Sequence, residues 1–281
     1  MRQQALVFGF GFIGQAFASA ASAAGYQIAA TIRTPERRLE LEAMGIAAVP
    51  VGNRRELATA VKAASAILIT PPPGDDGCPA FAALNDLDLA GKWLGYLSTT
   101  GVYGDRDGGW VFEDSPRLPS STEGRRRVMA EDQWLSQGAH VFRLPGLYGP
   151  GRNVIERLRD GTARRIVKPG HVFSRLHHDD CASALMQSLV RPRPGGVYNL
   201  CDDEPAPAEE VTAWAAREFG FDLPPQIAWD DPSLSPATRR FYQDNKRVSN
   251  ALAKAELDWR PRYPTYRDGL TQLFNASFTD R

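Results

Sequence analysis

Three glycines near the start of the chain have the spacing of a dinucleotide-binding loop. Gly9, Gly11 and Gly14 form the pattern G-x-G-x-x-G directly after the apolar run Ala5–Phe8. The first glycine permits a tight turn, the second lets a pyrophosphate approach the backbone, and the third lets a helix pack close to the strand. The start of that helix offers free N–H groups and a positive dipole end to phosphates. We therefore predict that this loop binds a dinucleotide, through Gly9, Phe10, Gly11, Phe12, Ile13 and Gly14.

The end of the next strand predicts which dinucleotide binds. An Asp or Glu there binds the ribose 2′-hydroxyl of NAD, whereas a nearby Arg accommodates a 2′-phosphate. The predicted strand 27–32 is followed by Arg33, with no acid at the strand end. We predict NADP, with NAD as the alternative, and Arg33 as the phosphate ligand. Arg37 and Arg38 either support it or form a solvated helix face.

Hydroxyl residues and prolines follow the later predicted strands. Ser98 and Thr99 come after a strand at 93–97, where substrate would meet the nicotinamide. Prolines stop the strands where a parallel sheet presents its ligand crevice. We expect the cofactor to be lined there by Thr70, Pro71, Pro72 and Pro145.

Strands and helices alternate along the chain, which predicts an α/β fold of Rossmann type, a doubly wound parallel sheet with helices on both faces. The expected strands are 5–8, 27–32, 46–51, 66–70, 93–97, 140–144 and 196–200. The expected helices are 15–24, 39–44, 56–64, 80–90, 123–137, 153–160, 179–190, 207–219, 246–257 and 266–274, with 222–236 irregular.

Composition excludes several classes of function. The 281 residues carry 33 Lys+Arg against 33 Asp+Glu, so no global field favours nucleic acid or a membrane surface. No apolar run is long enough to span a bilayer. Residues 1–23 could pass for a secretory signal, but three glycines interrupt their apolar core. The three cysteines are scattered, without disulfide or metal spacing, which favours the cytoplasm.

The motifs together resemble the extended short-chain dehydrogenase/reductase family, the NAD(P)-dependent epimerase/dehydratases. The chain carries G-F-I-G at 11–14, S-T at 98–99 followed by V-Y-G, R-x-x-x-x-Y-G-P-G at 143–151, F-S-R-x-H at 173–177 and G-V-Y-N-L at 196–200. These segments run in family order over nearly the whole chain. The resemblance implies that Thr99 is the catalytic Ser/Thr and that Ser98, Tyr103, Tyr148 and Arg175 face the substrate. The alternatives are that Thr99 caps the backbone at the strand end and that Tyr103 packs in the interior.

The chain departs from this family at the catalytic dyad Y-x-x-x-K. Glu123 stands at the tyrosine position and Arg127 at the lysine position. In the family the Tyr relays a proton and the Lys binds the nicotinamide ribose. Arg127 could bind that ribose but cannot relay a proton, whereas Glu123 could act as a base. The alternative is a surface ion pair between these residues, four apart on one helix face. We predict catalytic roles for Thr99, Glu123 and Arg127.

The C-terminal half resembles the substrate lobe of the extended family. We predict an NAD(P)-binding Rossmann domain at 1–150 and a substrate lobe at 151–281, interleaved with the last Rossmann elements in one compact unit. Basic residues at 152–168 suit an anionic substrate or a solvated face. His171, His177 and His178 lack metal-ligand spacing, and adjacent histidines should point apart, so we predict no metal.

The leading hypothesis is an atypical short-chain dehydrogenase/reductase that binds NADP. It would act as an oxidoreductase or epimerase/dehydratase on a small polar, anionic or sugar-like substrate, and family members often form homodimers. The alternative is a non-catalytic NADP(H)-binding redox sensor, which loss of the dyad favours. The intact substrate-lobe segments favour the enzyme.

Overall fold

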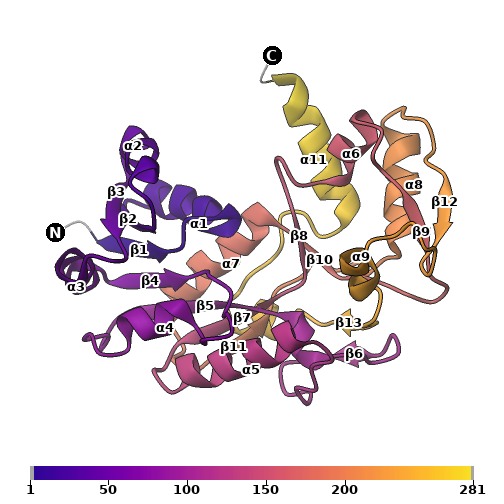
Figure 1. The fold of residues 1–281 in the computed structure, drawn as a ribbon. Coiled ribbons are helices and arrows are strands. Elements are labelled where there is room, and N and C mark those ends of the chain that lie inside the picture. The colour runs from indigo at the N-terminus through magenta and orange to yellow at the C-terminus, as the bar shows by residue number, and fades with distance from the viewer. Residues whose placement is uncertain (1–2, 280–281) are drawn as a thin grey trace.

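A computed structural model describes residues 3–279 and contains one large parallel sheet (Figure 1). Its strands are β1 (Gln4–Phe8), β2 (Gln27–Ile32), β3 (Ala47–Pro50), β4 (Ala66–Ile69), β5 (Trp93–Thr99), β7 (His140–Leu144) and β11 (Val197–Asn199). The spatial order is β11-β7-β5-β4-β1-β2-β3. The chain runs outward from β1 to β3, then returns to β4 on the other side of β1. The carboxyl ends of β1 and β4 therefore flank the switch point, where such sheets bind ligands.

Helices cover both faces of this sheet (Figure 1). They are α1 (Phe12–Ala23), α2 (Glu36–Ala43), α3 (Arg54–Ala63), α4 (Pro79–Leu84), α5 (Thr122–Leu135), α6 (Val154–Arg159), α7 (His178–Val190), α8 (Ala208–Glu218), α9 (Pro236–Phe241), α10 (Ala251–Glu256) and α11 (Tyr266–Thr279), with a 3-10 turn η1 (Thr100–Tyr103). Within residues 3–279, no helix combines the length and the apolar character that crossing a membrane requires.

Two apolar layers sandwich the sheet, because successive side chains of a strand point to opposite faces. Val7 belongs to one layer, with Phe17 of α1 and Leu185 of α7. Phe8 belongs to the other, with Trp134 of α5. Strands that are buried on both sides read as continuous apolar runs, so the sequence predicted the seven central strands correctly.

A smaller lobe holds α6, α8 and α11 around its own apolar cluster (Figure 1). Three short strand pairs lie outside the large sheet: β8 (Gly146–Tyr148) with β10 (Arg175–His177), β9 (Arg165–Val167) with β12 (Gln226–Ala228), and β6 (Trp110–Val111) with β13 (Arg247–Val248).

Two predictions for the C-terminal part are wrong. The expected helix 246–257 begins only at Ala251, because Arg247 and Val248 pair with β6. The segment 222–236 is not wholly irregular, since Gln226–Ala228 pairs with β9. In both cases a strand partner distant in sequence overrides local propensity. The expected helix 80–90 also ends early, at Leu84.

Candidate active site at the sheet switch point

The glycine loop is held by hydroxyls from the two neighbouring strands. Gly9 has a φ of +90°, a left-handed conformation that favours glycine. Its N–H donates to Thr31 Oγ1 over 2.9 Å, and its carbonyl accepts from Thr70 Oγ1 over 2.5 Å. Thr70, predicted to line the cofactor, thus also fixes the loop. The sequence analysis did not predict this role of Thr31. The only indication in the sequence was a hydroxyl residue near the end of the strand that precedes Arg33.

Gly11 and Gly14 differ in the space around them. A Cβ at Gly14 would lie 2.8 Å from the Gly9 carbonyl oxygen and 3.0 Å from Val7 Cγ1, so α1 packs against β1 only with glycine there. A Cβ at Gly11 would meet nothing within 4 Å. That open space lies at the start of α1, which has no side-chain cap and no acidic residue in its first turn. The loop therefore fits a pyrophosphate, which would fill the space and accept from the free N–H groups.

The basic residues after β2 lie on one side of this loop. Arg33 is exposed and makes no hydrogen bond or ion pair with any residue of 3–279. Arg37 Nη2 donates to the Phe10 carbonyl over 3.4 Å and pairs with Glu40, and Arg38 lies 3.6 Å from Glu42 and from Glu56. Arg33 is thus a free cation at the strand end, whereas Arg37 and Arg38 have acidic partners.

The predicted prolines lie after their strands. Pro71 packs against the glycine loop, where its Cγ would be 2.9 Å from a Cβ on Gly9. Pro72 is exposed, and Pro145 is partly exposed after β7. Direct contact of these prolines with a cofactor stays a prediction.

Thr99 is the polar group best placed for chemistry at the end of β5. Its side chain is partly exposed, and Oγ1 accepts from the Gly101 N–H over 3.1 Å. This bond uses a lone pair of the oxygen, so the hydroxyl proton remains available to a substrate oxygen.

The prediction that Ser98 and Tyr103 face the substrate is wrong, because both hydroxyls form hydrogen bonds inside the protein. Ser98 is buried and donates to Glu131 Oε1 over 2.6 Å. Tyr103 is fully buried; it donates to Asn199 Oδ1 over 2.7 Å and accepts from Arg143 Nη1 over 2.8 Å. Neither side chain is free to contact substrate.

These residues belong to a buried ionic network beneath Thr99. Glu131 is fully buried and forms a bidentate pair with Arg143, with Nε–Oε1 at 3.1 Å and Nη2–Oε2 at 2.9 Å. Arg117 joins Glu131 at 3.2 Å, and Arg143 also donates to the Glu113 carbonyl. The network ties β5, β7, α5 and the loop before α5 together, so it can hold Thr99 in a fixed position.

Glu123 and Arg127 are not brought together. Arg127 Nη1 donates to Tyr96 Oη over 3.2 Å and to the Leu97 carbonyl. Burial raises the pKa of Tyr96 to about 12, so it stays a neutral acceptor. Glu123 is exposed in the first turn of α5 and has no hydrogen-bond or ion-pair partner within residues 3–279. The structure thus contains no Glu123–Arg127 ion pair; it leaves Glu123 free and orients Arg127 toward β5.

Tyr148 and Arg175 lie where the smaller lobe meets the sheet. Tyr148 Oη is buried without a hydrogen-bond partner in the described chain, and burial raises its pKa. Arg175 Nη1 donates to the carbonyls of Phe173 and Ala206, over 2.8 and 2.9 Å. Asp202 is 2 % exposed, and burial raises its pKa well above the ordinary range. The contact of Tyr148 and Arg175 with substrate stays a prediction.

The adjacent histidines do not point apart, contrary to the expectation from the sequence. The rings of His177 and His178 lie 4.7 Å apart, and one ligand atom each from His177, His178 and Asp179 falls within 4.8 Å of the others. However, His177 Nδ1 accepts from the Asp179 N–H over 3.3 Å and so caps α7. The absence of a metal stays a prediction.

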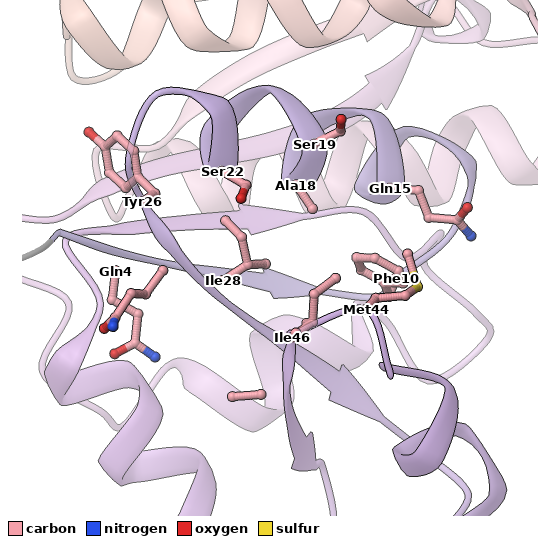
Figure 2. A pocket seen from close by; sticks show the side chains of 13 residues that line it. Gln4, Phe10, Gln15, Ala18, Ser19, Ser22, Tyr26, Ile28, Met44 and Ile46 are labelled. Carbon is pink, nitrogen blue, oxygen red and sulfur yellow. The ribbon is translucent and has the colours of Figure 1, made fainter. Parts of the chain in front are cut away.

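A hollow of about 680 Å³ lies elsewhere, on the flank of α1 (Figure 2). Figure 2 shows Gln15, Ser19 and Ser22 of α1 on one side, and Ile28 and Ile46 opposite. No charged side chain of the described residues lines it. Phe10 of the glycine loop lines this hollow but Gly11 does not, and we place the phosphate site by the strand ends and the open space at Gly11.

No family model matches the chain. The chain is 32 % identical to protein YeeZ of Escherichia coli K12, over 94 % of this chain and 97 % of YeeZ. The chain belongs to the YeeZ family. A conserved protein of unknown function from Silicibacter pomeroyi has a solved structure with a TM-score of 0.90 and 42 % identity, covering 98 % of this chain and 99 % of that one.

More distant solved structures share this fold. The dTDP-glucose 4,6-dehydratase of Bacillus anthracis, solved in complex with NAD, superposes with a TM-score of 0.79 at 19 % identity, covering 99 % of this chain and 97 % of that one. A 3-diazoavenalumate denitrifying reductase of Streptomyces is 31 % identical over 46 % of this chain and 45 % of its own length. The fold predicted from the motifs is thus confirmed, and these neighbours in fold include a dehydratase of the kind that the motifs resemble.

Proposed function

We propose that this YeeZ-family protein is an NADP(H)-dependent oxidoreductase or epimerase/dehydratase-like enzyme for a small polar substrate. The observation that carries the proposal is the open space at Gly11, at the uncapped start of α1. The Bacillus anthracis dehydratase, solved in complex with NAD, supports a dinucleotide cofactor. The Streptomyces reductase supports an enzymatic role.

Arg33 supports NADP over NAD. No acid at the end of β2 is available to bind a ribose 2′-hydroxyl, and Arg33 lacks an internal partner within residues 3–279. A 2′-phosphate would neutralise it and accept two hydrogen bonds from the planar guanidinium. Thr31 uses its hydroxyl on Gly9, so it does not replace the missing acid.

We assign the catalytic roles to side chains that keep hydrogen-bonding capacity not used inside the protein. Thr99 donates to a substrate oxygen, because Gly101 already occupies one of its lone pairs. Glu123 acts as the base, since its exposed carboxylate has no other partner within the described chain. Arg127 keeps donors for the nicotinamide ribose besides those directed to Tyr96 and Leu97. Bound NADP(H) would supply or accept the hydride. The lobe at 151–281 would supply the other substrate contacts, including Arg175.

Turnover of single variants tests these roles. We would follow NADPH oxidation with a panel of small polar carbonyl compounds, then compare Thr99→Val and Glu123→Gln on the best substrate. Each variant should lower kcat by about 10²-fold or more and leave the Kd for NADPH within about twofold. Glu218→Gln, at the exposed end of α8, serves as the control for loss of a carboxylate. Full activity of both variants would overturn the site assignment.

A non-catalytic redox sensor is the second candidate. It is favoured by the absence of Y-x-x-x-K and by the engagement of Arg127 with Tyr96 and Leu97. A sensor predicts different affinities for NADPH and NADP⁺ with no turnover on any carbonyl. Thr99→Val and Glu123→Gln would then leave both affinities unchanged.

A further inference from the structure

Phe12, the first residue of α1, is covered from two sides by residues distant in sequence. The Arg152 guanidinium carbon lies 5.6 Å from the centre of the Phe12 ring, and the His178 ring centre lies 5.4 Å from it. Both come from beyond β7: Arg152 from the turn after β8, and His178 from the start of α7. Figure 1 shows α7 beside α1, so this contact brings the C-terminal half of the chain to the glycine loop.

The turn that presents Arg152 is fixed by its backbone. The N–H of Gly149 donates to the Arg152 carbonyl, and the N–H of Arg152 donates to the Gly149 carbonyl, both over 3.1 Å. A Cβ at Gly149 would lie 2.2 Å from His178 Cδ2 and 3.0 Å from Phe12 Cζ. The turn is therefore packed directly against Phe12 and His178, with no room for a side chain at Gly149.

The charge of Arg152 has no partner within residues 3–279. Its guanidinium makes no hydrogen bond or ion pair there, and its one described contact is the Phe12 ring. The neighbouring Glu156 accepts from the Gly151 N–H and from Asn153 Nδ2, and Asp179 lies 3.4 Å from His178 Nε2. The nearby carboxylates thus have other partners.

Two unsatisfied positive features therefore lie together. The first turn of α1 has free N–H groups and no acid, and the Arg152 guanidinium lies over the side chain of its first residue. A guanidinium over an aromatic ring keeps the N–H groups at its own edges available to a bidentate acceptor. A diphosphate supplies such oxygens and the negative charge that both features lack.

We propose that Arg152 is a binding residue for the cofactor pyrophosphate, held in place by its contact with Phe12. This inference rests on the proposed function, because the diphosphate is that of the bound dinucleotide. Arg152 and the N–H groups of α1 contact the phosphates from two parts of the chain. Arg33 contacts only the 2′-phosphate, so the two arginines have separable effects.

Calorimetric titration of the full chain with NADPH and NADH tests the inference. Arg152→Gln should raise both dissociation constants by the same factor, about tenfold, as loss of charged hydrogen bonds to phosphate predicts. Arg33→Ala should raise only that for NADPH. Arg164→Gln is the matched control, since Arg164 is also exposed and without a partner among residues 3–279. It should bind like the wild type.

Arg152→Lys separates charge from geometry. It keeps the charge but not the planar fork, so we expect a loss of about threefold. Equal affinities of Arg152→Gln and the wild type would overturn the inference and leave the proposed function intact. A loss confined to NADPH would also overturn it, because the effect would then lie at the 2′-phosphate. If the wild type binds neither dinucleotide, the proposed function fails and the inference fails with it.

Discussion

The proposed cofactor half of the switch point, at β1, β2 and β4, and its proposed catalytic half, at β5 and α5, are built in different ways. At β1, β2 and β4 the backbone itself forms the site, with Gly9 held by Thr31 and Thr70 and with open space at Gly11. At β5 and α5 the polar side chains are mostly used by the protein, because Ser98 and Tyr103 bind the buried Glu131–Arg143 pair. The geometry of a backbone site depends on the spacing of its glycines. A site made of side chains can exchange its hydrogen-bond partners without a change of fold.

The largest effect should come from the buried network. Glu131→Ala would leave Arg143 buried and without its carboxylate, at a cost of about 3–5 kcal/mol in the free energy of unfolding. Urea denaturation measures this value. Asp132, on the exposed side of α5, offers the matched control, and Asp132→Ala should cost under about 1 kcal/mol. A cost below about 1 kcal/mol for Glu131→Ala would show that the network does not hold the catalytic half together.

A pH-dependent effect should appear in the smaller lobe. His171 is buried beside Phe173 and Tyr242 with no partner for either ring nitrogen among the described residues, and burial together with Lys168 lowers its pKa to about 4. Below about pH 6.5 the unfolded chain binds a proton that the folded chain does not bind. Stability present above pH 6.5 is therefore lost as the pH falls toward 4, by up to roughly 3 kcal/mol.

His171→Phe isolates this contribution. The variant should match or exceed the wild type in stability at about pH 7.5, because it removes two unsatisfied nitrogens. It should lose less stability than the wild type between about pH 6.5 and 4.5. His177, whose pKa burial lowers to about 3, remains in both proteins and cancels from the difference. Parallel stability curves over this range would contradict the expected role of His171.

The two glycines of the cofactor half should separate stability from binding. Gly14→Ala should destabilise the chain by about 1–3 kcal/mol, because its Cβ would crowd Gly9 and Val7. Gly11→Ala should change stability by less than about 1 kcal/mol, since its φ of −99° suits alanine and its surroundings are open. It should nevertheless weaken NADPH binding at least tenfold. Tight NADPH binding by Gly11→Ala would place the pyrophosphate elsewhere.

The sequence predicted the fold well, including the strand, glycine turn and helix at residues 4–23, because these depend on local patterns. Apolar runs at 5–8 and 66–69 indicate doubly buried strands. It could not predict β6 with β13, since a two-residue pair between Trp110 and Arg247 depends on tertiary contact. Nor could position in a motif show that Ser98 points to Glu131, or that Arg127 binds Leu97 instead of Glu123.

The most direct test of the account is calorimetric titration of the wild-type chain with NADPH and NADH, each repeated on Arg33→Ala. The account predicts that NADPH binds at least tenfold more tightly than NADH, and that Arg33→Ala removes most of this preference. Equal affinity for the two cofactors would contradict the assignment of Arg33. Binding of neither would contradict the central claim that the glycine loop is a working dinucleotide site.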